Sequence, residues 1–247
     1  MKIVDVKGLI LSETNYRDSS KILNVLTEEY GLIGILSKGC RNMKSKLRAT
    51  SRKMIYGTFH FYYKENGLST LISIDLINDY HQILMDLESM VYSSVILDLT
   101  AQVVKQTESK EILSLATTAL EKIALGLSPI TILQIVKLKY LEDLGVAPIL
   151  DSCANCGTTS NIISLSPTAG GFICKDCYQN EGYYQEQTIQ LIRMYYHVDI
   201  AKITKIKVKE EITKEIDTFL KDYYERYTGI YLKDDKMLKK IAKYVEV

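Results

Sequence analysis

Residues 54–63, MIYGTFHFYY, form the stretch that decides how the first third of the chain folds. Successive side chains of a β-strand point to opposite faces of its sheet, so the alternation in this stretch separates two surfaces. The surface that we assign to a core consists of Ile55, Phe59, Phe61 and Tyr63. The opposite surface carries Tyr56, Thr58, His60 and Tyr62. The stretch therefore predicts a strand with one buried face.

Four further apolar runs surround this strand in the sequence. They are IVDVKGLIL (3–11), KILNVLT (21–27), GLIGILS (31–37) and LSTLISIDL (68–76). Turn residues separate the runs, which predicts five strands between residues 3 and 76. Before the last run, Asn66-Gly67 predicts a hairpin with a two-residue type I′ turn, because both central residues of that turn need a positive φ.

After Tyr80 the apolar residues recur with the period of a helix. We expect one amphipathic helix of about 20 residues, with core positions at Leu84, Leu87, Met90, Val91 and Ile96. Further helices are expected at 110–125, 128–145, 185–198, 210–227 and 234–245. The expected fold class is α+β, with a five-stranded β domain at 1–80 followed by an α-helical domain at 81–150 and 180–247.

The cysteines show the most specific pattern in the chain: C-x2-C, a gap of 17 residues, and C-x2-C. The residues are Cys153, Cys156, Cys174 and Cys177. Two-residue spacing lets both thiolates of a pair bind one ion, and the gap lets a hairpin return the second pair. Four thiolates fill a tetrahedral coordination sphere, so we predict one structural Zn²⁺ per chain, in an insertion at 151–179.

Two disulfides, or a redox-active C-x-x-C, are the alternatives for these cysteines. The N-terminal MKIVDVKGLILSE lacks the uninterrupted apolar core of an export signal, and no apolar run is long enough to span a bilayer. We therefore expect a cytoplasmic protein with no membrane partner, where thiols stay reduced and a metal site is favoured. The fifth cysteine, Cys40, is interpreted as a small residue in a turn at the end of a strand.

The formal net charge is +1, but residues 30–63 hold seven Lys or Arg and no Asp or Glu. These cations are Lys38, Arg41, Lys44, Lys46, Arg48, Arg52 and Lys53. A solvated loop is the simplest interpretation. However, small five-stranded OB barrels bind single strands by combining cations that contact phosphates with aromatic rings that stack on bases. We therefore predict salt-sensitive, sequence-tolerant nucleic-acid binding by these seven residues and Tyr56.

Recognisable catalytic motifs are absent from the sequence. It contains no dinucleotide-binding glycine motif, no phosphate-binding P-loop and no H-E-x-x-H, and its three histidines form no recognisable pairing. We therefore expect a protein that is not an enzyme. A metal-dependent nuclease built from scattered carboxylates is the catalytic alternative.

Two groups of motifs resemble the bacterial recombination mediator family RecO. The first is GLIL-x4-YRDSSKILNVLTEEYG (8–31), followed by SKGCRNMKSKL (37–47). The second is LKYLEDLGVAP-x-LD-x-C-x-x-CG (138–157), followed by SP-x-x-GGFIC-x-x-C (166–177). The motifs occur in the family's order over residues 8–177.

The resemblance implies an N-terminal OB-fold barrel, a helical domain and an inserted zinc motif. It also implies binding of single- and double-stranded DNA, annealing of complementary strands and, with RecR, assistance to RecA in displacing single-strand binding protein (SSB). The family's basic pattern places DNA contacts at Lys38, Arg41 and Lys44, and relatives bind the acidic SSB tail in a helical pocket. We expect a nucleoid-associated protein. A zinc-stabilised adaptor between proteins in transcription or RNA processing is the alternative function.

Overall fold

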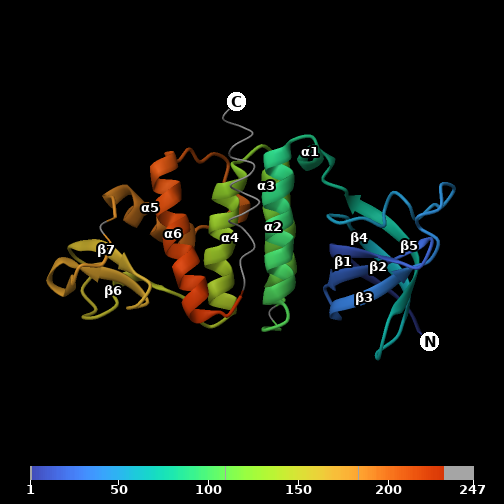
Figure 1. Ribbon diagram of the computed structural model, residues 1–247, viewed down its shortest axis with the longest axis horizontal. Coiled ribbons are helices and arrows are strands. Elements are labelled where there is room, and N and C mark those ends of the chain that lie inside the picture. The colour runs from blue at the N-terminus through green and yellow to red at the C-terminus, as the bar shows by residue number, and fades with distance from the viewer. Residues whose placement is uncertain (1, 109, 183, 231–247) are drawn as a thin grey trace.

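The computed structural model describes residues 2–108, 110–182 and 184–230. Figure 1 shows three parts in a row: a β-barrel at one end, a group of helices in the middle and a small β-sheet at the other end. This arrangement confirms the expected α+β class. No helix among the described residues is both long enough and apolar enough to cross a membrane.

The N-terminal part is a closed five-stranded barrel with the strand order β1-β2-β3-β5-β4. Its strands are β1 (Lys2–Tyr16), β2 (Ser20–Thr27), β3 (Gly31–Ser37), β4 (Tyr56–Tyr63) and β5 (Ser69–Asn78). A short parallel contact between β3 and β5, together with antiparallel pairing of β4 with β1, closes the barrel. Five strands closed in this way agree with the OB type expected from the sequence.

Two local features of the barrel differ from expectation. β1 continues to Tyr16, because its second half pairs with β2 in a register that ends at Tyr16 and Ser20. The β4–β5 connection is a hairpin, but the type I′ turn was wrong because Asn66 does not have a positive φ. Residues 64–68 form a longer loop, and the Lys64 N–H donates to Ser69 Oγ at 3.2 Å.

The alternation along β4 is confirmed. Phe59 and Phe61 have no exposed surface and Ile55 is 1% exposed, and all three lie in the barrel core. The barrel also has an outer apolar face, where Leu9 and Leu11 belong to the same cluster as the buried helical residues. β1 therefore contributes to two cores, and the barrel packs directly on the helices.

The helical part contains seven described helices. They are α1 (His81–Leu84), α2 (Leu87–Val103), α3 (Glu111–Ala124), α4 (Pro129–Asp143), α5 (Glu186–His197), the 3₁₀ helix η2 (Ile200–Lys202) and α6 (Glu210–Tyr227). The helices expected after Lys110, Ser128, residue 184 and Lys209 are confirmed within two residues. The helix expected at 234–245 lies outside the described residues.

The single long helix expected after Tyr80 was wrong. The chain turns at residues 85–86, and the Asp86 carboxylate caps α2 by accepting from the Ser89 N–H at 2.7 Å. Leu84, Leu87 and Met90, which were expected in the core, are 42%, 50% and 36% exposed. The side-chain cap starts a new helix at this turn. The apolar residues near the turn are therefore separated from the stripe that α2 buries.

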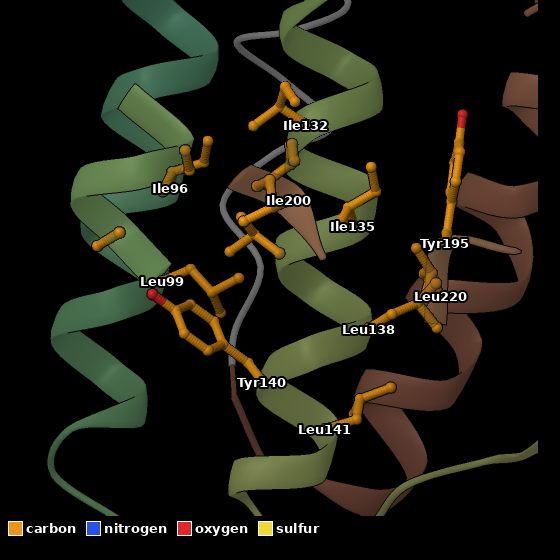
Figure 2. Close-up of a cluster of buried hydrophobic side chains, with 14 of the residues drawn as sticks. Ile96, Leu99, Ile132, Ile135, Leu138, Tyr140, Leu141, Tyr195, Ile200 and Leu220 are labelled. Carbon is orange, nitrogen blue, oxygen red and sulfur yellow. The ribbon is translucent and has the colours of Figure 1, made fainter. Parts of the chain in front are cut away.

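α4 is the centre of the helical part. Figure 2 shows its side chains pointing toward α2 on one side and toward α5 and α6 on the other. Its buried positions are Thr131, Ile132, Leu133, Gln134, Ile135, Val136, Lys137, Leu138, Tyr140 and Leu141. The buried Tyr140 hydroxyl lies 2.8 Å from Thr100 Oγ1 of α2, and Gln134 Nε2 donates to the Thr213 carbonyl of α6 at 2.9 Å. α4 thus joins the two halves by apolar packing and by hydrogen bonds of buried side chains.

The third part is a sheet with the order β6-β8-β7. It consists of β6 (Ile149–Cys153), β7 (Ile162–Ser166) and β8 (Gly171–Cys174), and the 3₁₀ helix η1 (Lys175–Cys177) follows. Leu150, Leu165 and Phe172 are almost completely buried in the helical core cluster. The cysteine-bearing segment is therefore a layer packed on the helices.

On the outer surface of the barrel, His60 joins three strands. Its Nδ1 lies 2.6 Å from Asp5 Oδ1 on β1, and its Nε2 lies 3.0 Å from Asp75 Oδ2 on β5. Both ring nitrogens can donate only in the protonated imidazolium. The hydrogen bonds to Asp5 and Asp75 accordingly raise the pKa of His60 above 6.5.

We expect this bridge to make barrel stability depend on pH. Because the pKa of His60 is raised by folding, its contribution is complete below the unfolded value of about 6.5 and is lost as the pH rises through the folded value. The unaltered chain should be more stable than His60→Gln at about pH 6, and the difference should shrink toward pH 9 or so. Denaturant unfolding of both proteins across this range measures it. A difference that stays constant with pH would contradict the bridge.

Candidate nucleic-acid interface and metal centre

Residues 38–55, here called the basic loop, connect β3 to β4. The loop opens with three consecutive tight turns. The N–H groups of Asn42, Ser45 and Arg48 donate to the carbonyls three residues earlier, at 3.1, 3.1 and 3.2 Å. Paired main-chain groups of this kind give a loop without regular secondary structure a defined course.

The inward side of the basic loop anchors it to the barrel. Cys40 is 2% exposed, and Leu47 packs against the barrel core. The buried hydroxyls of Ser37 and Ser51 lie 2.8 Å apart, so the end of β3 is tied to the later part of the loop. The Arg41 N–H also donates to the Ser19 carbonyl in the β1–β2 turn at 2.8 Å. Cys40 therefore belongs to this anchor, remote from the other four cysteines in sequence.

The outward side of the basic loop carries five exposed cations. They are Lys38, Arg41, Lys44, Lys46 and Arg48. None of the five forms an ion pair with another described residue. Arg48 donates to Met43 Sδ and Arg41 to the Arg17 carbonyl, contacts that leave both positive charges uncompensated. The structure thus gathers five of the seven predicted cations on one solvent-facing surface, which we call the loop surface.

The other two predicted cations, Arg52 and Lys53, are partly exposed and form ion pairs within the protein. Lys53 Nζ donates to Asp98 Oδ1 at 2.8 Å and to Ser94 Oγ at 2.7 Å, both on α2. Arg52 Nη2 lies 3.3 Å from Asp79 Oδ2, just after β5. These contacts connect the end of the basic loop to neighbouring elements. The structure therefore offers Arg52 and Lys53 a structural role in place of the predicted contact with DNA.

Tyr56 does not face an open groove. It is paired with Leu9 of the neighbouring strand β1 and packs, partly buried, against the helical core. Burial, followed by the nearby carboxylates of Glu28 and Glu121, raises the pKa of the Tyr56 hydroxyl. Because this ring is packed partly buried against the helices, its stacking on a base stays a prediction.

The β1–β2 turn supplies an aromatic and basic pair that the sequence-based prediction missed. The Arg17 guanidinium carbon lies 5.2 Å from the centre of the Tyr16 ring, within the range of a cation–π contact. Arg17 is exposed, and its carbonyl accepts from Arg41 Nη1 at 3.4 Å. Tyr16-Arg17 stands beside Asp18 in the sequence. Because of the Asp18 carboxylate, the pair does not belong to a segment free of acidic residues.

The four cysteine side chains come together because β6 and β8 are parallel. Cys153 ends β6 and Cys174 ends β8, so both pairs leave the same edge of the sheet. All four Sγ atoms lie within 4.8 Å of one another. Gly171 permits the close approach of the strands, because a Cβ there would lie 2.1 Å from the Ile149 carbonyl oxygen.

The surroundings of these thiols favour the thiolate at Cys153 and the protonated thiol at Cys177. Burial acts against the thiolate at Cys153, but N–H groups of Cys174, Cys156 and Asn155 directed at it lower its pKa to about 6. Side-chain hydrogen bonds with Cys156 and Cys174 raise the pKa of Cys177 to about 12. A divalent cation at the centre would favour the thiolate form of all four cysteines. Four converging sulfurs match the donor set and number of a closed tetrahedral site.

A hollow of about 610 Å³ lies between α3, α4 and η2. Its acidic lining residues are Glu111, Glu142, Asp143 and Asp199. Lys139, which also lines it, donates to the Tyr196 carbonyl and lies near that residue's ring. Four carboxylates make this hollow a poor match for an acidic peptide.

Comparison with known proteins agrees with this architecture. The family model described as "Recombination protein O N terminal" matches residues 1–80, and "Recombination protein O C terminal" matches residues 84–236. Three similar curated proteins each bear the name DNA repair protein RecO. The Bacillus velezensis protein is 32% identical over 94% of this chain and 92% of its own length.

The protein from Listeria monocytogenes serotype 4b is 30% identical and covers 96% of this chain and 94% of its own length. That from Bacillus pumilus is also 30% identical, over 96% of this chain and 93% of its own length. The two family models together cover the barrel, the helices and the cysteine-bearing sheet. The chain belongs to the RecO family of recombination proteins.

Proposed function

We propose that this member of a DNA repair and recombination family is a non-enzymatic mediator. It binds single- and double-stranded DNA, anneals complementary strands and, together with RecR, promotes loading of RecA on DNA coated by SSB. It acts in the cytoplasm, in association with the nucleoid. Its contribution is to hold strands in proximity, so no covalent bond is made or broken.

The observation that carries the proposal is the loop surface. Five exposed cations without carboxylate partners among the described residues stand on a barrel that fixes their backbone. Binding of phosphates by Lys and Arg releases condensed counterions and requires no particular base sequence. Tyr16 and Arg17 supply a neighbouring aromatic and planar cationic group on which bases can stack. Both features suit a protein that must act on any sequence.

The four cysteines are proposed to hold one structural Zn²⁺. When bound, the ion supplies the bonds that hold together the turn after β6 and the 3₁₀ helix after β8. The same segment reaches α5, because Asp151 Oδ1 accepts from Arg193 Nε at 3.1 Å and lies 3.0 Å from His197 Nε2. The metal therefore supports the helical part. All four ligand positions belong to cysteines, so none remains for a substrate.

The zinc-stabilised adaptor is the alternative function, and one observation favours a protein contact. Leu84, Met85 and Leu87 form an exposed apolar corner where the barrel meets the helices. Adjacent exposed apolar side chains of this kind are a candidate protein contact. The mediator also requires protein partners, namely RecR and the SSB tail, so the corner agrees with both functions. The loop surface is what favours the mediator.

The loop surface predicts steep salt dependence. Five phosphate contacts correspond to a slope of log affinity against log salt near about −3.5 for single strands. Arg41→Glu/Lys44→Glu should weaken binding of fluorescent single-stranded DNA by about ten-fold or more, whatever its sequence, and reduce that slope. Fluorescence anisotropy at several salt concentrations measures both quantities. Unchanged affinity and slope would exclude the loop surface as the DNA site.

Lys53→Gln is the matched control within the same segment. Loss of the contacts with Asp98 and Ser94 should cost about 1 kcal/mol of unfolding free energy, because both groups are partly exposed. Affinity for DNA should stay within about two-fold, because Lys53 points toward α2. Unfolding in urea and anisotropy separate the two effects. A variant of full stability with weakened DNA binding would return Lys53 to the DNA contacts.

The metal site predicts about one zinc ion per chain by elemental analysis. Cys153→Ser/Cys156→Ser should lose the ion and much of the thermal stability, because apparent binding free energies of structural zinc are about 10–16 kcal/mol. Cys40→Ser is the control and should retain the metal, since Cys40 belongs to the loop anchor. A fully folded, metal-free protein with two disulfides would disprove the zinc site.

A further inference from the structure

A second basic segment lies far from the loop surface, between η2 and α6. Residues 200–209 read IAKITKIKVK, with four Lys and no Asp or Glu. We call residues 203–209 the connector. It has no helix or strand of its own, and it runs from the end of η2 to the first turn of α6.

Burial alternates along the connector. Ile203 is buried, and Ile206 and Val208 pack partly buried against the helical core. The intervening side chains of Lys205, Lys207 and Lys209 are exposed. The apolar residues thus hold the chain extended on the helices and direct the three ammonium groups into solvent.

The main chain of the connector is fixed at both ends. Lys122 Nζ of α3 donates to the carbonyls of Ala201 and Ile203, at 2.6 and 2.8 Å. The Lys209 carbonyl accepts from the Thr213 N–H at 3.1 Å, in the first turn of α6. The three lysines therefore project from an ordered backbone.

Two acidic residues that flank the connector are paired with other cations. Asp199 lies 3.4 Å from Lys202, and Glu210 lies 2.5 Å from Lys214. Lys205, Lys207 and Lys209 form no ion pair with any other described residue. Their charges stay uncompensated, as on the loop surface.

The spacing of the lysines suits an extended polyanion. Residues on one side of an extended chain repeat at about 6.6 Å, twice the rise per residue. This repeat is comparable to the separation of successive phosphates in an extended single strand. None of the large exposed hydrophobic residues of the described chain lies on the connector, so it offers charge without an apolar pocket. An acidic peptide with apolar side chains would find little to bind here.

We propose that the connector is a second nucleic-acid site, which binds the phosphates of a second strand while the loop surface holds the first. The proposal rests on DNA binding by the loop surface. In Figure 1, α6 lies beyond α4 and α2 from the barrel, which agrees with packing of the barrel on α2 and of α6 on α4, and the connector leads into the first turn of α6. One chain can therefore hold two strands at separate places, as annealing requires.

Lys205→Glu/Lys207→Glu tests the second site. Its matched control is Lys105→Glu/Lys110→Glu, which makes the same change of charge on exposed lysines next to the α2–α3 connection. The probes are two non-complementary oligodeoxythymidine strands, one with a donor fluorophore and one with an acceptor. Energy transfer reports bridging, and anisotropy of one strand alone reports binding to the first site. Thermal unfolding verifies that each variant is folded.

We expect the connector variant to bind the first strand within about two-fold of the unaltered chain and to lose bridging by about ten-fold. The control should retain bridging, and Lys205→Gln/Lys207→Gln should show an intermediate loss. Mass measurement of the bridged species should give one chain with two strands. Arg41→Glu/Lys44→Glu should lose first-strand binding.

Two results would overturn the second site while leaving the proposed function intact. One is unchanged bridging by the connector variant, which would leave an acidic protein as the remaining class of ligand. The other is a bridged species that always contains two chains, each with one strand. Normal first-strand binding by Arg41→Glu/Lys44→Glu would instead reject the loop surface, so the two failures are distinguishable.

Discussion

Burial of α4 on all sides is the constraint on which the rest of the structure depends. A helix whose side chains are apolar around its whole circumference is stable only when neighbours cover every face. α2 and α3 cover one side of α4, and α5 and α6 cover the other. The barrel packs on α2 and the cysteine-bearing sheet packs on α5, so the packing of α4 sets how the two ends of the molecule are placed.

The chain has a net charge near zero, yet it forms a cationic surface because carboxylates pair with some of its cations and leave others unpaired. Around the basic loop, Glu13 pairs with Lys21 and accepts from the Lys53 N–H, and Asp98 pairs with Lys53. These carboxylates fix the backbone and leave the outward lysines and arginines unpaired. Mutual repulsion among those cations is small in water, where charges are screened. Their attraction to a polyanion that lies against them is favourable. The surface is thus defined by which cations lack a partner.

Local features of the chain could be predicted from the sequence, because they depend on neighbours within a few residues. The alternation at Phe59 and Phe61 and the two C-x2-C pairs are of this kind. The role of Lys53 could not be predicted, because its partner Asp98 is 45 residues away. The packing of Tyr56 against the helices could not be predicted for the same reason, since the second face of the barrel is recognisable only when the helices lie on it. Arg17 was missed because the prediction considered only a segment without acidic residues, and Asp18 follows Arg17 in the sequence.

Contacts between residues far apart in the sequence also determine how a bound metal ion would affect DNA binding. The cysteine-bearing sheet contacts α5 through Asp151, and α5 leads through η2 into the connector. The connector also depends on α3, where Lys122 holds its first carbonyls. A zinc ion that orders the sheet would thus steady α5 and the start of the connector without touching a phosphate. The proposed metal and the proposed second site are then linked through shared packing, so loss of zinc should impair bridging of two strands more than binding of one.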